Sequence, residues 1–164
     1  MSAVKIATPS DRDEIARLHF TSHTTSFAPF ASPQWLESLK LVDYEAKWRD
    51  WLDDQRPGSR TFISLDEGGA VVGVVRIYPD SERGEAQLGN MHVSPELAGA
   101  GIGRTLMTAA LGFMRDQGFV IARLGVVQEN RRARRFYESH GWVVDELLPR
   151  GQEGVPIATY RLDL

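Results

Sequence analysis

Apolar residues recur along the chain with two spacings, one typical of amphipathic helices and one typical of strands. The helical spacing appears in four stretches, of which the second follows Ser32-Pro33, a favourable start for a helix. Glycines follow the last two stretches, at Gly118 and Gly141, where glycine commonly ends a helix. The pattern therefore predicts helices within 8–20, 33–52, 104–117 and 130–140.

The strand-like runs are short and are separated by turn residues. The runs "TFISL" and "AVVGVVRIY" flank the tetrapeptide "DEGG" at 66–69, which favours a β-hairpin. A strand, a helix and a second strand follow one another between 86 and 127, which requires a parallel pair with a right-handed crossover. Strands are expected at 4–7, 61–65, 70–78, 86–93, 119–127, 143–147 and 158–162.

The predicted order of elements is β-α-α-β-β-β-α-β-α-β-β, which indicates an α/β (α+β) fold with a mixed central sheet flanked by helices. A chain of 164 residues is long enough to bury a sizeable core. No repeat, low-complexity tract or linker divides the sequence. We therefore expect residues 1–164 to form a single domain.

Composition and charge exclude several classes of protein. The net charge of −3 gives no footprint for non-specific nucleic-acid binding. No apolar run approaches the ~18 residues of a membrane span, and the stretch MSAVKIATPSDRDE lacks the apolar segment of a secretory signal, so a cytoplasmic location is expected. Because the chain has no cysteine, disulfides, thiolate metal sites and a cysteine nucleophile are excluded.

The least ordinary stretch is PELAGAGIGRTLM, in which three glycines alternate just before a helix. Free N–H groups and the helix dipole make such a start an anion site, best suited to a phosphate or pyrophosphate. Arg104 in the first turn opposes the dipole unless an anion lies beside it. Arg131 and Arg132 repeat this anomaly at the next helix, which predicts one polyanionic ligand between the two helices.

Two common phosphate-binding motifs do not match this stretch. The dinucleotide fingerprint needs a third glycine where Arg104 stands. The mononucleotide P-loop needs a glycine and a lysine where Ala98 and Arg104 stand, so that motif stays a distant alternative.

A third motif matches at two places. The segment LGNMHVSPELAGAGIGRTLM, followed by NRRARRFYESHGW, resembles the two signatures of the GCN5-related N-acetyltransferase (GNAT) family. The loop signature falls on 98–103, with Ala98 where the family prefers Arg or Gln. The second signature falls on Asn130, Ala133, 136–138 and 141–142. The predicted order of elements matches as well, so the resemblance covers essentially the whole chain.

The resemblance implies a function and a set of site residues. Acetyl-CoA would be the co-substrate, no metal would be needed, and a primary amine would attack the thioester directly in a ternary complex. Backbone groups would hold the pantetheine arm at Met91, His92 and Val93. The N–H groups of the loop would hold the pyrophosphate at Gly99, Ala100, Gly101, Ile102, Gly103 and Arg104.

Two side chains of the second signature have alternative roles. Asn130 would reach the cofactor arm, and it is also placed to cap the helix that follows. Tyr137 would be the catalytic acid that protonates the departing thiolate. A tyrosine on an apolar helix face is otherwise a core residue.

The general base is left open by the sequence. Histone-modifying relatives carry a glutamate where this chain has Gln87, and those that modify ribosomal-protein N-termini carry one where it has Gly125. An amine with a pKa near 10.4 must lose a proton before it attacks, so a base is useful. The candidates are Glu85, His92, His19 and His23, or none of these.

The acceptor site is expected between 21 and 52, where the sequence offers aromatic side chains at Phe27, Phe30 and Trp35, hydroxyls, and no net positive patch. This composition favours a small-molecule amine over an acidic acceptor. The alternatives are an amine of a protein or peptide, and a non-catalytic module that binds acyl-CoA. A homodimer is compatible with the sequence, whereas nucleic-acid and membrane partners are not expected.

Overall fold

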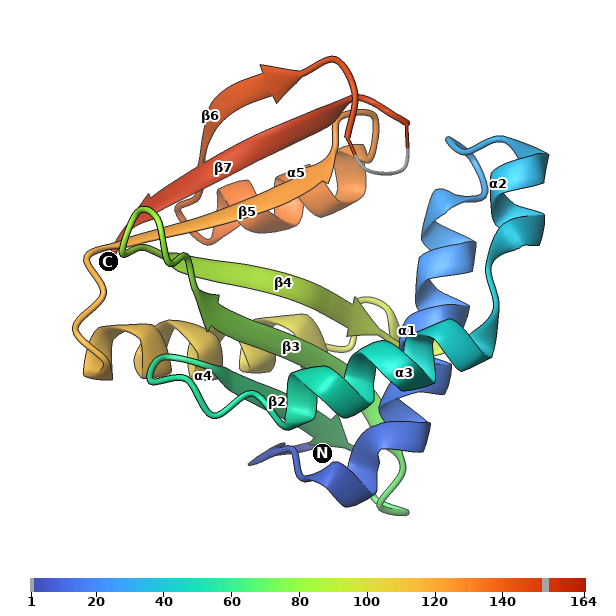
Figure 1. Cartoon of the computed structure of the whole chain (residues 1–164), viewed down its shortest axis with the longest axis horizontal. Coiled ribbons are helices and arrows are strands. Elements are labelled where there is room, and N and C mark those ends of the chain that lie inside the picture. The colour runs from blue at the N-terminus through green and yellow to red at the C-terminus, as the bar shows by residue number, and fades with distance from the viewer. Residues whose placement is uncertain (1, 152–153) are drawn as a thin grey trace.

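A computed structural model describes residues 2–151 and 154–164 of the chain. Within them, one sheet contains seven strands in the order β1-β2-β3-β4-β5-β7-β6 (Figure 1). The strands are β1 (Ala3–Ile6), β2 (Arg60–Leu65), β3 (Val71–Pro79), β4 (Ala86–Val93), β5 (Ile121–Val127), β6 (Val143–Leu148) and β7 (Ile157–Asp163). The helices are α1 (Arg12–Phe27), α2 (Pro33–Ser38), α3 (Leu41–Leu52), α4 (Ile102–Asp116) and α5 (Arg131–Ser139), with short 3₁₀ turns at Pro9–Asp11 and Pro95–Leu97.

The predicted α/β class and order of elements are confirmed. β2 and β3 form the predicted antiparallel hairpin, and β4 and β5 form the predicted parallel pair. The second helical stretch is divided into α2 and α3, because Leu39 and Lys40 adopt extended backbone conformations. Ser32 caps α2, since its hydroxyl accepts a hydrogen bond of 3.2 Å from the N–H of Trp35.

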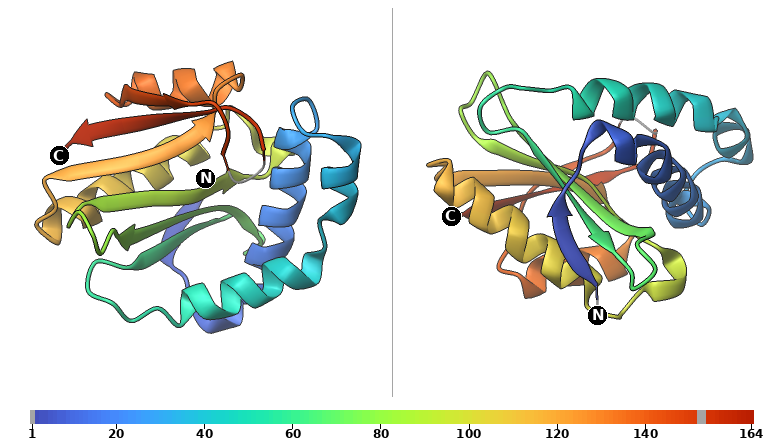
Figure 2. Two further views of the ribbon diagram at one scale, coloured as in Figure 1. Left: turned by 45° about the horizontal axis from the view of Figure 1, so that its top comes forward. Right: turned by 90° about the horizontal axis from the view of Figure 1, so that it is seen from below.

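Helices cover both faces of the sheet (Figure 2). The apolar side of α4 packs on β2, β3 and β4, and α5 packs on the same face. α1 and α3 cover the opposite face of β2 and β3, where Trp48 is fully buried. At Gly73 of β3 a Cβ atom would lie 2.8 Å from the side chains of Ile102 and Leu106, so glycine lets α4 approach the sheet closely.

β4 and β5 pair only at their first residues, Ala86 with Ala122 and Gln87 with Arg123. Beyond this point β4 stays paired with β3, while β5 stays paired with β7 along its whole length. The register of β3 and β4 shifts at a bulge beside Asn90, which has a φ of +52°. The two strands therefore diverge toward α1 and α2, and the sheet divides into two halves (Figure 1).

The closed end of this divergence is held by ion pairs. Arg123 of β5 binds the carboxylate of Glu85, which directly precedes β4, and the carboxylate of Asp145 on β6. Among the described residues, no helix is long and apolar enough to cross a membrane.

Candidate active site

The divergence of β4 and β5 opens into a cleft of about 1550 Å³. One end of the cleft is bounded by the first turns of α4 and α5. Another part of the cleft is bounded by α1 and α3, and the turn between β3 and β4 lines it near the start of β4. The edge of β4 that faces β5 lies between these parts, and it includes the predicted residues Met91, His92 and Val93.

The start of α4 presents backbone N–H groups that the protein leaves free. Gly99 and Gly101 have φ values of +89° and +86°, and a Cβ atom at either position would meet nothing within 4 Å. Ala100 differs, because its N–H donates to the carbonyl of Leu97 at 3.1 Å, and it does not line the cleft. No described residue accepts a hydrogen bond from the N–H groups of Gly99, Gly101, Ile102, Gly103 and Arg104.

The third glycine of the loop serves packing. A Cβ atom at Gly103 would lie 3.2 Å from the ring of Phe136, so glycine lets α4 and α5 approach each other. The first turns of both helices therefore meet at one end of the cleft. Asn130 lies there as the N-cap of α5, where its Oδ1 accepts a hydrogen bond of 3.1 Å from the N–H of Ala133. Its cap role is confirmed.

The arginines near this end have different roles. Arg104 and Arg132 are exposed side chains that line the cleft, and neither has an ion-pair partner among residues 2–151 and 154–164. Arg134 instead donates to the hydroxyl of Tyr160 at 2.8 Å and to the carbonyl of Gln128 at 3.1 Å. Arg132 lines the cleft whereas the neighbouring Arg131 does not, so of these two residues only Arg132 shares the cleft with Arg104.

Tyr137 combines a packed ring with an accessible hydroxyl. Its ring centroid lies 5.4 Å from that of Phe136 and 6.4 Å from that of Trp142. The residue lines the cleft, and no group in the described part of the chain hydrogen-bonds its hydroxyl. Burial raises the pKa of Tyr137 to about 12, so this hydroxyl is protonated at neutral pH.

Three histidines gather at the other end of the cleft, His19 and His23 from α1 and His92 from β4. The ring centroid of His19 lies 4.3 Å from that of His92 and 5.3 Å from that of His23. Trp48 Nε1 donates to Nδ1 of His19 at 3.0 Å, so this nitrogen is an acceptor. These three side chains form the histidine cluster.

Burial keeps the histidine cluster neutral at pH 7. It lowers the pKa of His23 to about 4 and that of His92 to about 3, and it also lowers the pKa of His19. His23 Nδ1 lies 2.7 Å from the hydroxyl of Tyr44, and His92 Nδ1 lies 3.1 Å from the hydroxyl of Ser22. No three His, Cys, Asp or Glu side chains among the described residues are placed to hold a metal ion.

The structure separates the four candidate bases. Glu85 is bound to Arg123 at the closed end and does not line the cleft. His19, His23 and His92 all line the cleft, although only His23 and His92 are more than marginally exposed.

Part of the stretch 21–52 lines the cleft beside the histidine cluster, with Phe27 and Phe30 among the lining residues. Trp35 packs behind Phe27, with ring centroids 5.3 Å apart. Arg76 of β3 was not among the residues predicted from the sequence. In the fold it lines the cleft together with Arg56. The available signal was an arginine within the apolar run AVVGVVRIY.

The profile of the "Acetyltransferase (GNAT) family" matches residues 22–142. The chain belongs to the GNAT family. An uncharacterized N-acetyltransferase of Mycobacterium tuberculosis is 26% identical to this GNAT chain over 137 residues, which cover 83% of this chain and 85% of the relative. A mycothiol acetyltransferase of Thermobispora bispora is 31% identical over 147 residues, which cover 85% of this chain and 47% of the relative, so this chain spans about half of that protein.

Solved structures share the fold of this GNAT protein. The PaiA N-acetyltransferase from Thermoplasma acidophilum, solved in complex with coenzyme A, superposes with a TM-score of 0.81 at 18% identity. The match covers 99% of each chain. The divided sheet described above is thus a GNAT architecture along the whole chain.

The histidine cluster should make the stability of this GNAT protein depend on pH. Histidines in the unfolded chain titrate near pH 6.5, and their pKa values are lower in the folded protein. The unfolded state therefore binds more protons below pH ~6.5, and the free energy of unfolding should fall as the pH drops from ~6.5 toward ~4. Each buried histidine should contribute a slope of ~1.4 kcal/mol per pH unit in this window.

His92→Gln should remove one proton from this linkage and flatten the slope by about that amount, measured by urea unfolding at a series of pH values. His140→Gln is the control, because it replaces a histidine outside the histidine cluster and shows how such a replacement alone changes the slope. A His92→Gln variant with the wild-type slope would contradict the burial of a neutral imidazole at this position.

Proposed function

We propose that this protein transfers the acetyl group of acetyl-CoA to a primary amine of a small molecule, by direct attack in a ternary complex, and that residues 1–164 form one N-acetyltransferase domain. One observation carries the proposal. One cleft contains three features: free N–H groups at the start of α4, the edge of β4 that has no strand partner among the described residues, and the accessible hydroxyl of Tyr137. A ligand with a pyrophosphate, an amide-bearing arm and a thioester matches these three features in that order.

The pyrophosphate would lie at the start of α4. The free N–H groups of Gly99 and of 101–104 supply donors, and the helix dipole adds partial positive charge. Arg104 and Arg132 line this end without an ion-pair partner among the described residues, so their charges are available to phosphate oxygens. Coenzyme A bound to the PaiA structure supports this assignment by homology of fold.

The pantetheine arm would extend β4. Beyond Gln87 the edge of β4 toward β5 has no strand partner among the described residues, so the backbone of 91–93 offers donors and acceptors to the amides of the arm. This is strand addition, in which main-chain hydrogen bonds supply affinity. The arm would bring its thioester between the histidine cluster and Tyr137, while Asn130 Nδ2 is left to reach the arm.

The reaction requires a neutral amine and a stabilised leaving group. His23 and His92 are neutral at pH 7, so either imidazole can accept a hydrogen bond from the attacking amine, but the burial that lowers their pKa makes both weak bases, and the ammonium form of the acceptor therefore loses its proton to water. The nitrogen lone pair then forms a bond to the thioester carbonyl carbon, and the carbon–sulfur bond breaks as the tetrahedral intermediate collapses. The nitrogen loses its extra proton in this step, and that proton replaces the one that Tyr137 donates. Tyr137 donates its hydroxyl hydrogen to the departing sulfur, and the same burial that raises its pKa also disfavours the bare thiolate.

Tyr137→Phe should separate chemistry from binding. The variant keeps the packed ring and removes only the hydroxyl, so kcat should fall by ~10²–10⁴-fold while the affinity for CoA and the stability stay close to wild type. The measurement is kcat from CoA-thiol release at saturating acetyl-CoA over a panel of primary amines, together with the melting temperature.

Tyr160→Phe is the matched control. The ring of Tyr160 lies 6.4 Å from that of Tyr137, but its hydroxyl bonds Arg134 and Glu138 and does not line the cleft. This variant should lose stability and keep most of its kcat. Normal turnover in Tyr137→Phe would assign Tyr137 to the core. Failure of the wild type to release thiol with any amine would favour a non-catalytic acyl-CoA-binding module.

Gly101→Ala should weaken CoA binding. Alanine strains a backbone with a φ of +86° by ~1–2 kcal/mol, and relief of this strain turns the loop N–H groups away from the cleft. We expect the Kd for CoA to rise at least ~10-fold, measured by titration calorimetry.

Gly118→Ala is the control at the other end of α4. Gly118 has a φ of +82° and also has open space around a Cβ atom, so the cost in stability should be similar. It does not line the cleft, and its variant should bind CoA like the wild type. Equal Kd values for the two variants would refute a phosphate site at this loop.

A further inference from the structure

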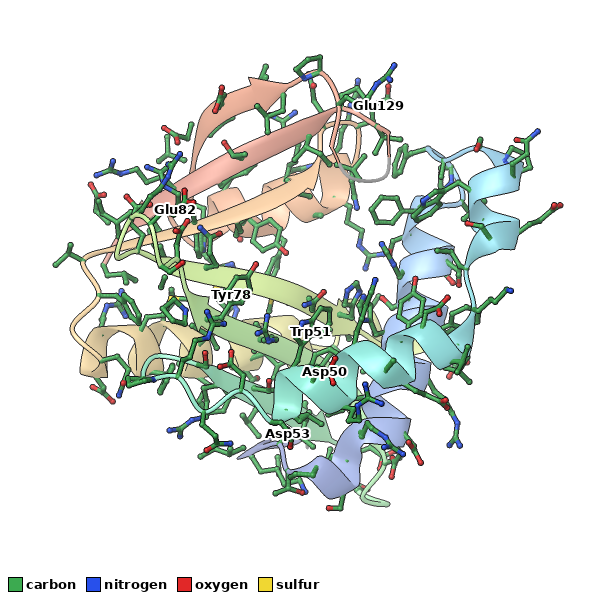
Figure 3. All side chains as sticks on the ribbon, in the orientation of Figure 1. Asp50, Trp51, Asp53, Tyr78, Glu82 and Glu129 are labelled. Carbon is green, nitrogen blue, oxygen red and sulfur yellow. The ribbon has the colours of Figure 1, made fainter. Side chains whose placement is uncertain are left out.

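The acceptor end of the cleft contains a buried cation. The side chain of Arg76 on β3 is only 8% exposed, yet the residue lines the cleft. Its guanidinium carbon lies 4.3 Å from the ring centroid of Tyr78 and 5.0 Å from that of Trp51. Figure 3 shows Trp51 on α3 and Tyr78 on β3 near each other beside the open part of the sheet. Burial of a guanidinium is costly unless anions or hydrogen bonds compensate it.

The protein compensates the charge of Arg76 only in part. Asp54 Oδ2 lies 3.2 Å from Nη2 of Arg76, but the same carboxylate also binds Arg56 at 2.8 Å and accepts from Ser59 at 2.8 Å. One carboxylate thus serves two guanidinium groups, which leaves one net positive charge. A guanidinium has five N–H donors, and Arg76 uses one of them within the described chain. Its other nitrogens are not fully buried, and because the residue lines the cleft they are accessible from it.

A glycine lies opposite Arg76 and makes room for the ring of Tyr78. Gly89 of β4 is the direct cross-strand partner of Arg76, and a Cβ atom there would lie 3.0 Å from the ring of Tyr78. Lys47 of α3 adds a second exposed cation at the same end, with no carboxylate partner among the described residues.

The acidic side chains that line the cleft, Asp80 and Glu82, lie on the turn between β3 and β4. Asp80 accepts hydrogen bonds from the N–H groups of Glu82 and Arg83 and from the side chain of Gln87, so its carboxylate is already engaged. Glu82 is exposed on the same turn (Figure 3). The buried charge that faces the interior of the cleft is therefore positive.

We propose that the acceptor amine carries a carboxylate, as an amino acid does, and that the free donors of Arg76 bind this carboxylate. This inference rests on the proposed acetyl transfer. Gly89 and His92 are three residues apart on β4, or ~10 Å at ~3.3 Å per residue. The arginine side chain spans part of that distance, so a small acceptor can present its carboxylate to Arg76 and its amine to the thioester. A planar guanidinium fork matches the two oxygens of a carboxylate.

The test compares acceptors that differ only in the carboxylate, namely amino acids and their methyl esters. The two forms also differ in the pKa of the amine, so the quantity compared is the ratio of kcat/KM between variant and wild type for each acceptor. Arg76→Met should lower kcat/KM at least ~10-fold for the acids, mostly through KM, and less than ~3-fold for the esters.

Two further variants keep the test decisive. Arg76→Lys retains the positive charge without the planar fork, so this variant should fold. Its kcat/KM should fall ~10-fold for the acids and stay close to wild type for the esters. Arg60→Met is the matched control, because Arg60 also stacks on an aromatic ring, 4.7 Å from the centroid of Phe113, and does not line the cleft. Arg60→Met should change kcat/KM by the same factor for the acids and for the esters.

The outcomes separate the two proposals. If both Arg76 variants lower kcat/KM for acids and esters by the same factor, Arg76 is a brace between α3 and β3, and the inference is overturned. Transfer to esters and simple amines with no activity on any amino acid would also overturn it. If the wild type acetylates no amine of either kind, acetyl transfer itself fails, which is a different result.

Discussion

The divergence of β4 and β5 is the constraint on which the site depends. The two strands are clamped at Ala86 and Gln87, where Arg123 binds Glu85, and each then follows a different neighbour. Strand edges inside a protein are normally paired, because unpaired backbone groups are costly to bury. Here residues of both strands line the cleft, where a ligand with its own amides can pair with the edge of β4.

Close packing places the helix starts at this opening. Gly73 lets α4 approach the sheet, and Gly103 lets α5 approach α4, so both first turns lie at one end of the cleft.

The cations at the two ends of the cleft differ in their environment. Arg104 and Arg132 are exposed and suit a highly charged group that keeps part of its hydration, whereas Arg76 is buried and suits a smaller anion. The neutral histidine cluster lies at the same end as Arg76.

The parts predictable from the sequence are those in which neighbouring residues determine the outcome. The hairpin, the glycine loop and the ends of α4 and α5 are local patterns, and the structure contains them at the predicted places. By contrast, α1 continues to Phe27, beyond the predicted end at 20, and the predicted helix within 33–52 is divided into α2 and α3. The sequence left the candidate bases open because their surroundings come from distant segments: Arg123 binds Glu85, which does not line the cleft. Arg76 was missed for the same reason, since Trp51 and Asp54 reach it only after α3 packs on β3.

The central claim is that coenzyme A fills the space between β4 and β5 and the start of α4. Exchange of backbone amide hydrogens, measured residue by residue with and without saturating CoA, tests it most directly. We expect exchange to slow at the amides of 91–93 that face β5 and at 101–104, whose N–H groups lack protein acceptors among the described residues. Exchange in the paired strands β1 and β2 should not change. Saturation with CoA that leaves exchange at both 91–93 and 101–104 unchanged would contradict the account.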